Sequence, residues 1–162
     1  MSNRYSIKLG GESGQGINTL GLLLSKSLKS AGYNIFAYRE YPSLIKGGVA
    51  SYQIDISTTS INSSSKSCNL LAILDPDSIK EYIAYLNPGG ILIYDDKTEF
   101  TEEQKSIIQN KNLSAVYIDT QAIAINVGGN PIMANIVMIS FIWRLLGLTQ
   151  QSLEIIVKEV FS

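Results

Sequence analysis

Four glycines stand close together near the start of the chain, in the order Gly10-Gly11-Glu12-Ser13-Gly14-Gln15-Gly16. They lie between a short apolar strand pattern and an amphipathic helix pattern. Such a junction exposes unpaired backbone N–H groups at the positive end of a helix, and glycine lets a phosphate approach closely. The spacing predicts a phosphate-binding loop, although a tight strand-to-helix turn without a ligand accounts for the same residues.

The order of these glycines differs from two familiar phosphate-binding motifs. A dinucleotide fingerprint has the pattern G-x-G-x-x-G, whereas residues 11–16 follow G-x-x-G-x-G. A P-loop needs Lys and then Ser or Thr after its second glycine, but Ile17 and Asn18 stand there. ATP hydrolysis is therefore not expected. An NAD(P)-binding enzyme, with Arg39 and Glu40 contacting the ribose, stays as an alternative.

The side chains that usually perform catalysis or bind metals are scarce in this chain. There is no histidine, which excludes His-based metal sites and Ser–His–Asp catalysis. The one cysteine, Cys68, cannot form an internal disulfide or hold an iron–sulfur cluster, and we expect an inert core thiol. The acidic pairs Asp75/Asp77 and Asp95/Asp96 are more simply helix starts and turns than metal ligands. We therefore expect no catalytic residue and no metal site.

Composition narrows the class of protein further. The 162 residues are 45% hydrophobic and 17% charged, as in ordinary globular domains, and the net charge is −1. A net charge of −1 does not indicate a nucleic-acid-binding protein. Residues 1–66, however, hold seven basic and three acidic side chains, and this excess of +4 would favour an anionic ligand. No apolar run is long enough for a signal peptide or a membrane span. We expect a single cytoplasmic domain, residues 1–162, without membrane or nucleic-acid partners.

Strand and helix patterns alternate along the chain and would position the glycine loop. Strands are expected at residues 5–9, 34–38, 49–56, 70–74, 91–94 and 115–118. Helices are expected at residues 17–30, 75–86, 101–109, 121–127, 132–146 and 152–161. Residues 39–48 read as a loop, 57–67 as a turn or exposed hairpin, and 87–90 as a turn. The alternation predicts a three-layer α/β/α, Rossmann-like fold with a mainly parallel sheet.

Three sequence blocks in order resemble one known family. Residues 11–17, Gly-Glu-Ser-Gly-Gln-Gly-Ile, resemble the G-x-G-G-Q-G-[VI] opening of the γ subunit or domain of 2-oxoacid:ferredoxin oxidoreductases. Residues 41–48, Tyr-Pro-Ser-Leu-Ile-Lys-Gly-Gly, resemble its P-S-x-x-R-G-G segment, and Asn135-Ile136-Val137-Met138, leading to residues 146–148, resemble its N-[MI]-V-x-L-G…LG helix. The resemblance spans residues 5–160 and is strongest to the N-terminal γ domain of the 2-oxoglutarate-type α subunit. Two positions depart from the family pattern: Ser13 replaces a glycine, and Lys46 replaces an arginine. Lys46 keeps the positive charge, but it lacks the guanidinium group that can donate two parallel hydrogen bonds to a carboxylate or phosphate.

The resemblance implies a non-catalytic part of an enzyme that oxidatively decarboxylates a 2-oxoacid to an acyl-CoA and reduces ferredoxin. Partner α and β subunits or domains would carry thiamine diphosphate, Mg²⁺ and iron–sulfur clusters, so the isolated chain would have no activity. The γ domain of this family contributes to the coenzyme A site. This implies the following cofactor-binding residues: Gly11, Glu12, Ser13, Gly14, Gln15, Gly16, Lys46 and Asn135.

Several alternatives stay open at this point. Glu12 would repel phosphate, so its side chain is expected to point away while its N–H binds. Asn135 could instead pack or cap a helix, and Lys46 could be an ordinary solvated lysine. A purely structural assembly domain, which binds no small molecule, is a further possibility for the whole chain.

Overall fold

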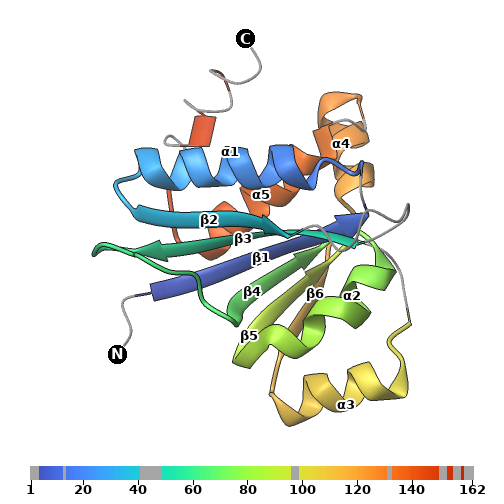
Figure 1. Cartoon of the computed structure of the whole chain (residues 1–162). Helices are drawn as coiled ribbons and strands as arrows, with labels where there is room; N and C mark the ends of the chain where they lie inside the picture. Colours follow the sequence, from blue (N-terminus) through green and yellow to red (C-terminus); the bar gives the residue numbers. More distant parts are fainter. Residues whose placement is uncertain are drawn as a thin grey trace.

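The structure is a computed structural model that describes residues 4–12, 14–40, 49–95, 99–130, 133–149, 153–154 and 158. A six-stranded sheet in the order β2-β3-β1-β4-β5-β6 forms its centre (Figure 1). Strands β1, β4, β5 and β6 run parallel, whereas β3 is antiparallel to both β1 and β2. The strands are β1 (Arg4–Glu12), β2 (Asn34–Glu40), β3 (Val49–Ser57), β4 (Cys68–Ile73), β5 (Leu86–Tyr94) and β6 (Ser114–Tyr117).

Helices cover both faces of this sheet, which confirms the predicted α/β/α class. Figure 1 shows α1 and α5 on one face and α2 and α3 on the other. The helices are α1 (Ile17–Ser30), α2 (Pro76–Tyr82), which runs into a short 3₁₀ turn (Ile83–Tyr85), α3 (Glu102–Asn110), α4 (Thr120–Gly128) and α5 (Ala134–Leu145). Most of the helix expected at 152–161, and all of the 41–48 block, lie outside the described residues.

The core forms where α1 and α5 pack on the central strands. The apolar positions of α1 recur every three or four residues, so Leu20, Leu24 and Leu28 lie on one face and are buried against the sheet. From α5, Ile142 and Trp143 join the same cluster. Burying each such side chain stabilises the fold by about 1.5–3 kcal/mol. This packing fixes where the first turn of α1 stands relative to α5.

Several element boundaries differ from the sequence-based expectation; for example, β2 extends to Glu40, into the loop expected at residues 39–48. Strand β1 was expected to stop at residue 9, but Gly10, Gly11 and Glu12 continue it because they pair with the first three residues of β3. A Cβ on Gly10 would lie 2.7 Å from Ile73 Cδ1, so this glycine allows close packing instead of forming a turn. The turn expected at residues 87–90 was also wrong, because these residues lie within β5. The pairing of β5 with β4 begins at Leu86 and shifts register before Ile91.

An ion pair between a buried lysine and a partly exposed glutamate lies on the sheet face opposite α1. Lys8 is only 2% exposed, and its Nζ donates to Glu40 Oε2 at 2.7 Å. The same ammonium group lies over the rings of Tyr82 and Tyr85, 5.1 and 5.4 Å from their centroids. Burial raises the pKa of Glu40, but hydrogen bonds from Lys8 and Ser51 and the charge of Lys8 outweigh it, so the pKa falls below its ordinary value. The pair therefore links β1 to β2 across β3.

We predict that Lys8→Ala lowers the free energy of unfolding by about 1.5–3 kcal/mol at pH 7, the range for hydrogen bonds to charged groups. Lys8→Met should cost less, because it keeps an apolar side chain against the two tyrosine rings. Because the pKa of Glu40 is lower in the folded than in the unfolded chain, its ionised form stabilises the fold at pH values above 4.5, the unfolded pKa. This contribution is lost as the pH falls through the pKa of the folded state. Urea denaturation should therefore show a smaller wild-type advantage below pH 4.5, and an advantage that does not change with pH would contradict the assignment.

Candidate functional site

A cavity of about 360 Å³ opens where the parallel strands end. Helix α1 leaves β1 toward one face of the sheet and α2 leaves β4 toward the other, so the chain diverges between these two strands (Figure 1). In open α/β sheets, ligands bind at such a switch point, outside the carboxyl ends of the strands. The residues that line the cavity are Gly14, Gln15, Gly16, Leu74, Asp95, Thr120, Gln121, Ala134 and Asn135.

Two reciprocal hydrogen bonds close the turn between β1 and α1. The backbone N–H of Gln15 donates to the carbonyl oxygen of Glu12 at 3.1 Å. In return, the N–H of Glu12 donates to the side-chain Oε1 of Gln15 at 2.9 Å. The Glu12 N–H, which was expected to bind the ligand, therefore already has an acceptor within the loop. The Glu12 residue is exposed.

Glycines 14 and 16 are required for different reasons. Both have positive φ, +106° and +82° respectively, a region that most side chains disfavour. A Cβ on Gly14 would meet nothing within 4 Å, so this position faces open space. A Cβ on Gly16 would lie 2.5 Å from Asn135 Nδ2, which donates to the carbonyl oxygen of Gln15 at 3.5 Å. Gly16 therefore allows the start of α5 to approach the loop.

The first turns of α1 and α5 both meet this cavity without an acidic cap. Neither helix has a side-chain N-cap hydrogen bond or an acidic residue in its first turn. Among the hydrogen bonds of the described residues, none uses the backbone N–H of Gly16 or Ile17 as donor. These N–H groups carry the partial positive charge of a helix N-terminus. The two helix ends therefore make this part of the cavity attractive to an anion.

Helix α4 also starts at the cavity, but two carboxylates neutralise the partial positive charge of its N-terminus. The Asp119 carboxylate accepts from Ala122 N at 2.8 Å. The Asp95 carboxylate accepts from Thr120 N at 2.7 Å and also from the Thr120 hydroxyl. Two negative charges therefore lie at this helix end, and we expect an anion to lie toward α1 and α5.

The structure brings together four of the eight predicted site residues at the cavity. Gly14, Gln15, Gly16 and Asn135 share the cavity, while Gly11 lies within the β1–β3 pairing behind the turn. Ser13 and Lys46 lie outside the described residues. Sequence reasoning missed five lining residues: Asp95, which it treated as a turn residue, and Leu74, Thr120, Gln121 and Ala134. Their positions just after parallel strands, or at the start of the next helix, are the signal that could have identified them.

Other residues that could perform catalysis or bind a metal have structural roles. Burial raises the pKa of the Cys68 thiol to about 12, and the residue is fully buried, as expected for an inert core thiol. Asp75 accepts from Ser78 N at 3.2 Å and so caps α2. Within the described ranges, no group of three or more potential metal ligands is close enough to hold an ion. In the same ranges, no helix has the length and apolar character that crossing a membrane requires.

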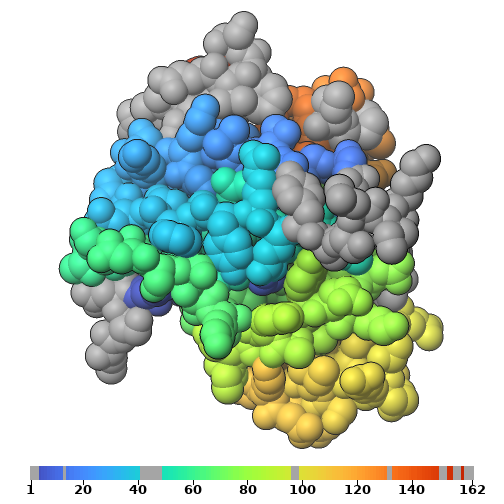
Figure 2. All heavy atoms as spheres, viewed as in Figure 1, coloured from blue at the N-terminus to red at the C-terminus, as the bar shows by residue number. Residues whose placement is uncertain are grey.

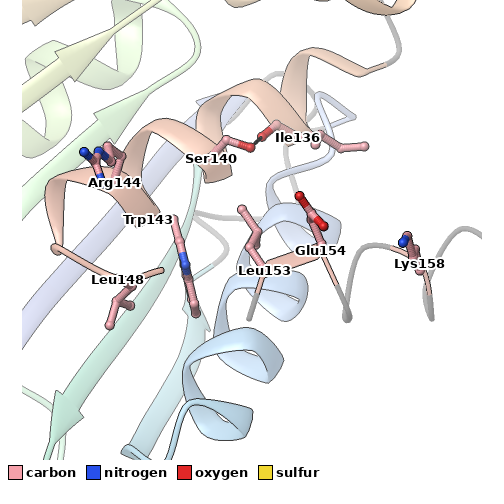
Figure 3. Close-up of a pocket in the computed structure, with 8 residues that line it drawn as sticks. All are labelled: Ile136, Ser140, Trp143, Arg144, Leu148, Leu153, Glu154 and Lys158. Atoms are coloured by element: carbon pink, nitrogen blue, oxygen red, sulfur yellow. Dashed lines mark hydrogen bonds between the residues drawn. The ribbon is translucent and has the colours of Figure 1, made fainter. Parts of the chain in front are cut away.

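A larger cavity, of about 680 Å³, lies along α5 (Figure 3). None of its lining residues comes from the glycine loop or from the ends of the parallel strands. Its wall combines four apolar with four polar or charged side chains, and the hydroxyl of Ser140 is already bonded to the carbonyl oxygen of Ile136 at 2.8 Å. The lining residues are Ile136, Ser140, Trp143, Arg144, Leu148, Leu153, Glu154 and Lys158. We assign the functional site to the smaller cavity, where helix ends and glycines meet.

Comparison with known proteins provides a family match. Residues 6–162 match the family described as pyruvate ferredoxin/flavodoxin oxidoreductase. A 2-oxoacid:ferredoxin oxidoreductase subunit alpha from Sulfolobus is 32% identical over 99 residues, which is 61% of this chain but only 15% of that protein. The 2-oxoglutarate synthase subunit KorC from Archaeoglobus fulgidus is 22% identical over 160 residues, covering 98% of this chain and 80% of the relative.

Solved structures share the fold. A 2-oxoglutarate:ferredoxin oxidoreductase from Magnetococcus marinus, solved with 2-oxoglutarate, coenzyme A and succinyl-CoA bound, superimposes with a TM-score of 0.84 at 20% identity. The match covers 99% of this chain and 27% of that chain. The γ subunit of a keto/oxoacid ferredoxin oxidoreductase from Geobacter sulfurreducens superimposes with a TM-score of 0.78 at 24% identity, covering 96% and 84% of the two chains.

Proposed function

The chain belongs to the pyruvate ferredoxin/flavodoxin oxidoreductase family, and we propose that it is the coenzyme A-binding and assembly module of a 2-oxoacid:ferredoxin oxidoreductase. The complete enzyme would oxidatively decarboxylate a 2-oxoacid to an acyl-CoA and pass the electrons to ferredoxin. The chain spans only 15% of the length of the first relatives it matches. The reaction centre of the enzyme is therefore assigned to its other chains or domains.

One observation carries the coenzyme A assignment: the uncapped first turns of α1 and α5 meet at one cavity beside two positive-φ glycines. A charge at a helix end is stabilised by about 0.3–1 kcal/mol when exposed, and by up to about 2 kcal/mol when partly buried. Two such ends acting together can hold a pyrophosphate without a basic side chain. Coenzyme A carries a pyrophosphate and a further phosphate, so its charge suits this position.

Each proposed binding residue has a separate role. The N–H groups of Gly16 and Ile17 would donate to phosphate oxygens, and Gly14 would leave the space that the phosphates need. The Asn135 amide, which already holds the loop carbonyl of Gln15, keeps the two helix ends together and has a second N–H to offer. Ser13 and Lys46 are proposed as contacts on the family pattern alone.

The remaining cofactors are proposed to lie elsewhere in the enzyme. Thiamine diphosphate with Mg²⁺ supplies the carbanion chemistry when bound, and iron–sulfur clusters carry electrons. This chain would bind coenzyme A so that its thiol can receive the acyl group at a neighbouring domain. This proposal implies that the chain assembles with α and β chains or domains, which in turn pass electrons to ferredoxin. It also implies a cytoplasmic location.

The geometry favours coenzyme A over the NAD(P) alternative. In a dinucleotide-binding fold the ribose is read by a residue at the end of the strand after the first helix, next to β1. Here β3 lies between β1 and β2, which moves the end of β2 away from the loop. Arg39 lies 5.7 Å from the centroid of the Tyr52 ring, and Glu40 is bonded to Lys8. Both side chains therefore have other partners.

Calorimetric titration of the assembled enzyme tests the proposal. We expect coenzyme A to bind at least tenfold more tightly than pantetheine, which lacks all of its phosphates, because about 1.4 kcal/mol of helix-end interaction is lost. NADPH serves as an anionic control and should not compete. Equal affinity for pantetheine and coenzyme A would refute phosphate binding. An assembled enzyme whose coenzyme A affinity is unchanged by Asn135→Asp would favour a purely structural role for this chain.

A further inference from the structure

Helix α4 exposes aliphatic side chains to an unusual extent. Val127 is 86% exposed and Ile125 52% exposed, and Ile123 and Met133 are also exposed. No charged residue occurs anywhere from residue 120 to residue 143. About a quarter to a third of the surface residues of a soluble monomer are charged. A helix of this composition on the outside of a domain is typical of a surface that another protein covers.

Two of these exposed residues, Ile123 and Val127, stand four positions apart on α4 and therefore share one face of the helix. Ala124 is buried, and α4 packs against α5, so the helix is held in place by a small residue. A Cβ on Gly128 would lie 2.6 Å from Met133 Sδ, which shows that Met133 packs against the end of α4. Figures 1 and 2 show α4, in orange, at the margin of the molecule. We name the exposed face of α4 that carries Ile123 and Val127 the α4 surface.

The α4 surface continues directly from the candidate site. Thr120 and Gln121, the first residues of α4, line the same cavity as the glycine loop. Any protein that covers the later turns of α4 therefore lies beside the opening of that cavity. The cavity is open, and its described wall comes from only a few strand and helix ends. A second protein surface would complete it.

We propose that the α4 surface docks a charge-poor, aliphatic face of the chain or domain that holds the reaction centre of the same enzyme. This inference rests on the proposed function, since coenzyme A must present its thiol to that reaction centre. Two observations favour this occupant over a second copy of the chain. The surface adjoins the coenzyme cavity, and the matched segment covers only 15% of relatives such as the Sulfolobus subunit, so most of their residues lie outside the matched part.

The test uses Val127→Glu in the assembled enzyme, with Leu22→Glu as the matched control. Leu22 is 43% exposed on α1 and lies outside the α4 surface, so it controls for placing a charge on an exposed aliphatic site. Native mass spectrometry or sedimentation would measure the dissociation constant of this chain from its partners. We expect Val127→Glu to weaken association at least tenfold, and Leu22→Glu by less than twofold. Thermal unfolding should be unchanged in both variants.

Hydrogen exchange provides a second measurement that needs no variant. Peptides covering residues 120–133 should exchange more slowly in the assembled enzyme than in the separate chain. Unaltered exchange together with normal assembly of Val127→Glu would overturn the proposal, as would loss of a homodimer only. Coenzyme A titration of the same samples separates this inference from the proposed function, because a failed phosphate site would leave the assembly defect of Val127→Glu intact.

Discussion

Gly14→Asp is expected to weaken coenzyme A binding to the assembled enzyme by about 2- to 30-fold, corresponding to the interaction of one charge with a helix end. The Cβ of residue 14 would meet nothing within 4 Å, so the change adds a carboxylate to open space beside the α1 N-terminus. That carboxylate would occupy the positive potential that the phosphates need, and it would repel them. Salt should reduce the effect, because the groups are exposed.

Gly14→Asn is the matched control, because Asn has the shape of Asp without its charge. Both residues tolerate positive φ better than most others, so any backbone strain at φ +106° should be similar in the two variants. Isothermal titration should show a much smaller loss of affinity for Asn. If both variants bound coenzyme A as the wild type does, or lost it equally, an electrostatic role for the loop would be ruled out.

Gly21→Ala is expected to lower the free energy of unfolding by about 1–3 kcal/mol, the range for overpacking a filled core. This sign is the opposite of what helix propensity predicts, since Ala in place of Gly on an exposed helix face stabilises by about 1 kcal/mol. A Cβ at residue 21 would come closer than 3.0 Å to three atoms of the Tyr52 ring. That ring is buried under α1 and also lies beside the Arg39 guanidinium.

Urea denaturation monitored by circular dichroism measures this effect. Leu22→Ala, on the exposed side of the same helix, should stay within about 0.5 kcal/mol of the wild type. In the Gly21→Ala background, Tyr52→Leu should recover part of the loss, because a smaller side chain leaves room for the added methyl group. Additive effects of the two changes, with no coupling, would show that the ring does not cause the destabilisation.

The fold class and the position of the glycine loop could be predicted from local sequence alone. Periodic leucines specify α1, continuous apolar runs specify β4 and β5, and Asp75 before Pro76 marks the start of α2. These signals lie within a few residues of the elements they define, because helices and caps depend on neighbours three or four positions away. The family blocks singled out Asn135 as a candidate coenzyme contact, and only the structure shows that it bonds to the loop at Gln15, 120 residues away in the chain.

Only the tertiary structure decided which glycines bend the chain and which helix ends are available. Gly10 and Gly11 look like the rest of the loop in sequence, yet pairing with β3 keeps them in a strand. Asp95 neutralises α4 through Thr120, across 25 residues, while α1 and α5 keep uncapped ends. Periodicity reports on near neighbours, whereas strand pairing, exposure and the accumulation of charge at one cavity depend on residues distant in the chain. The sequence therefore determined the parts of this site, and the packing of distant strands and helices determined which of their N–H groups can still bind an anion.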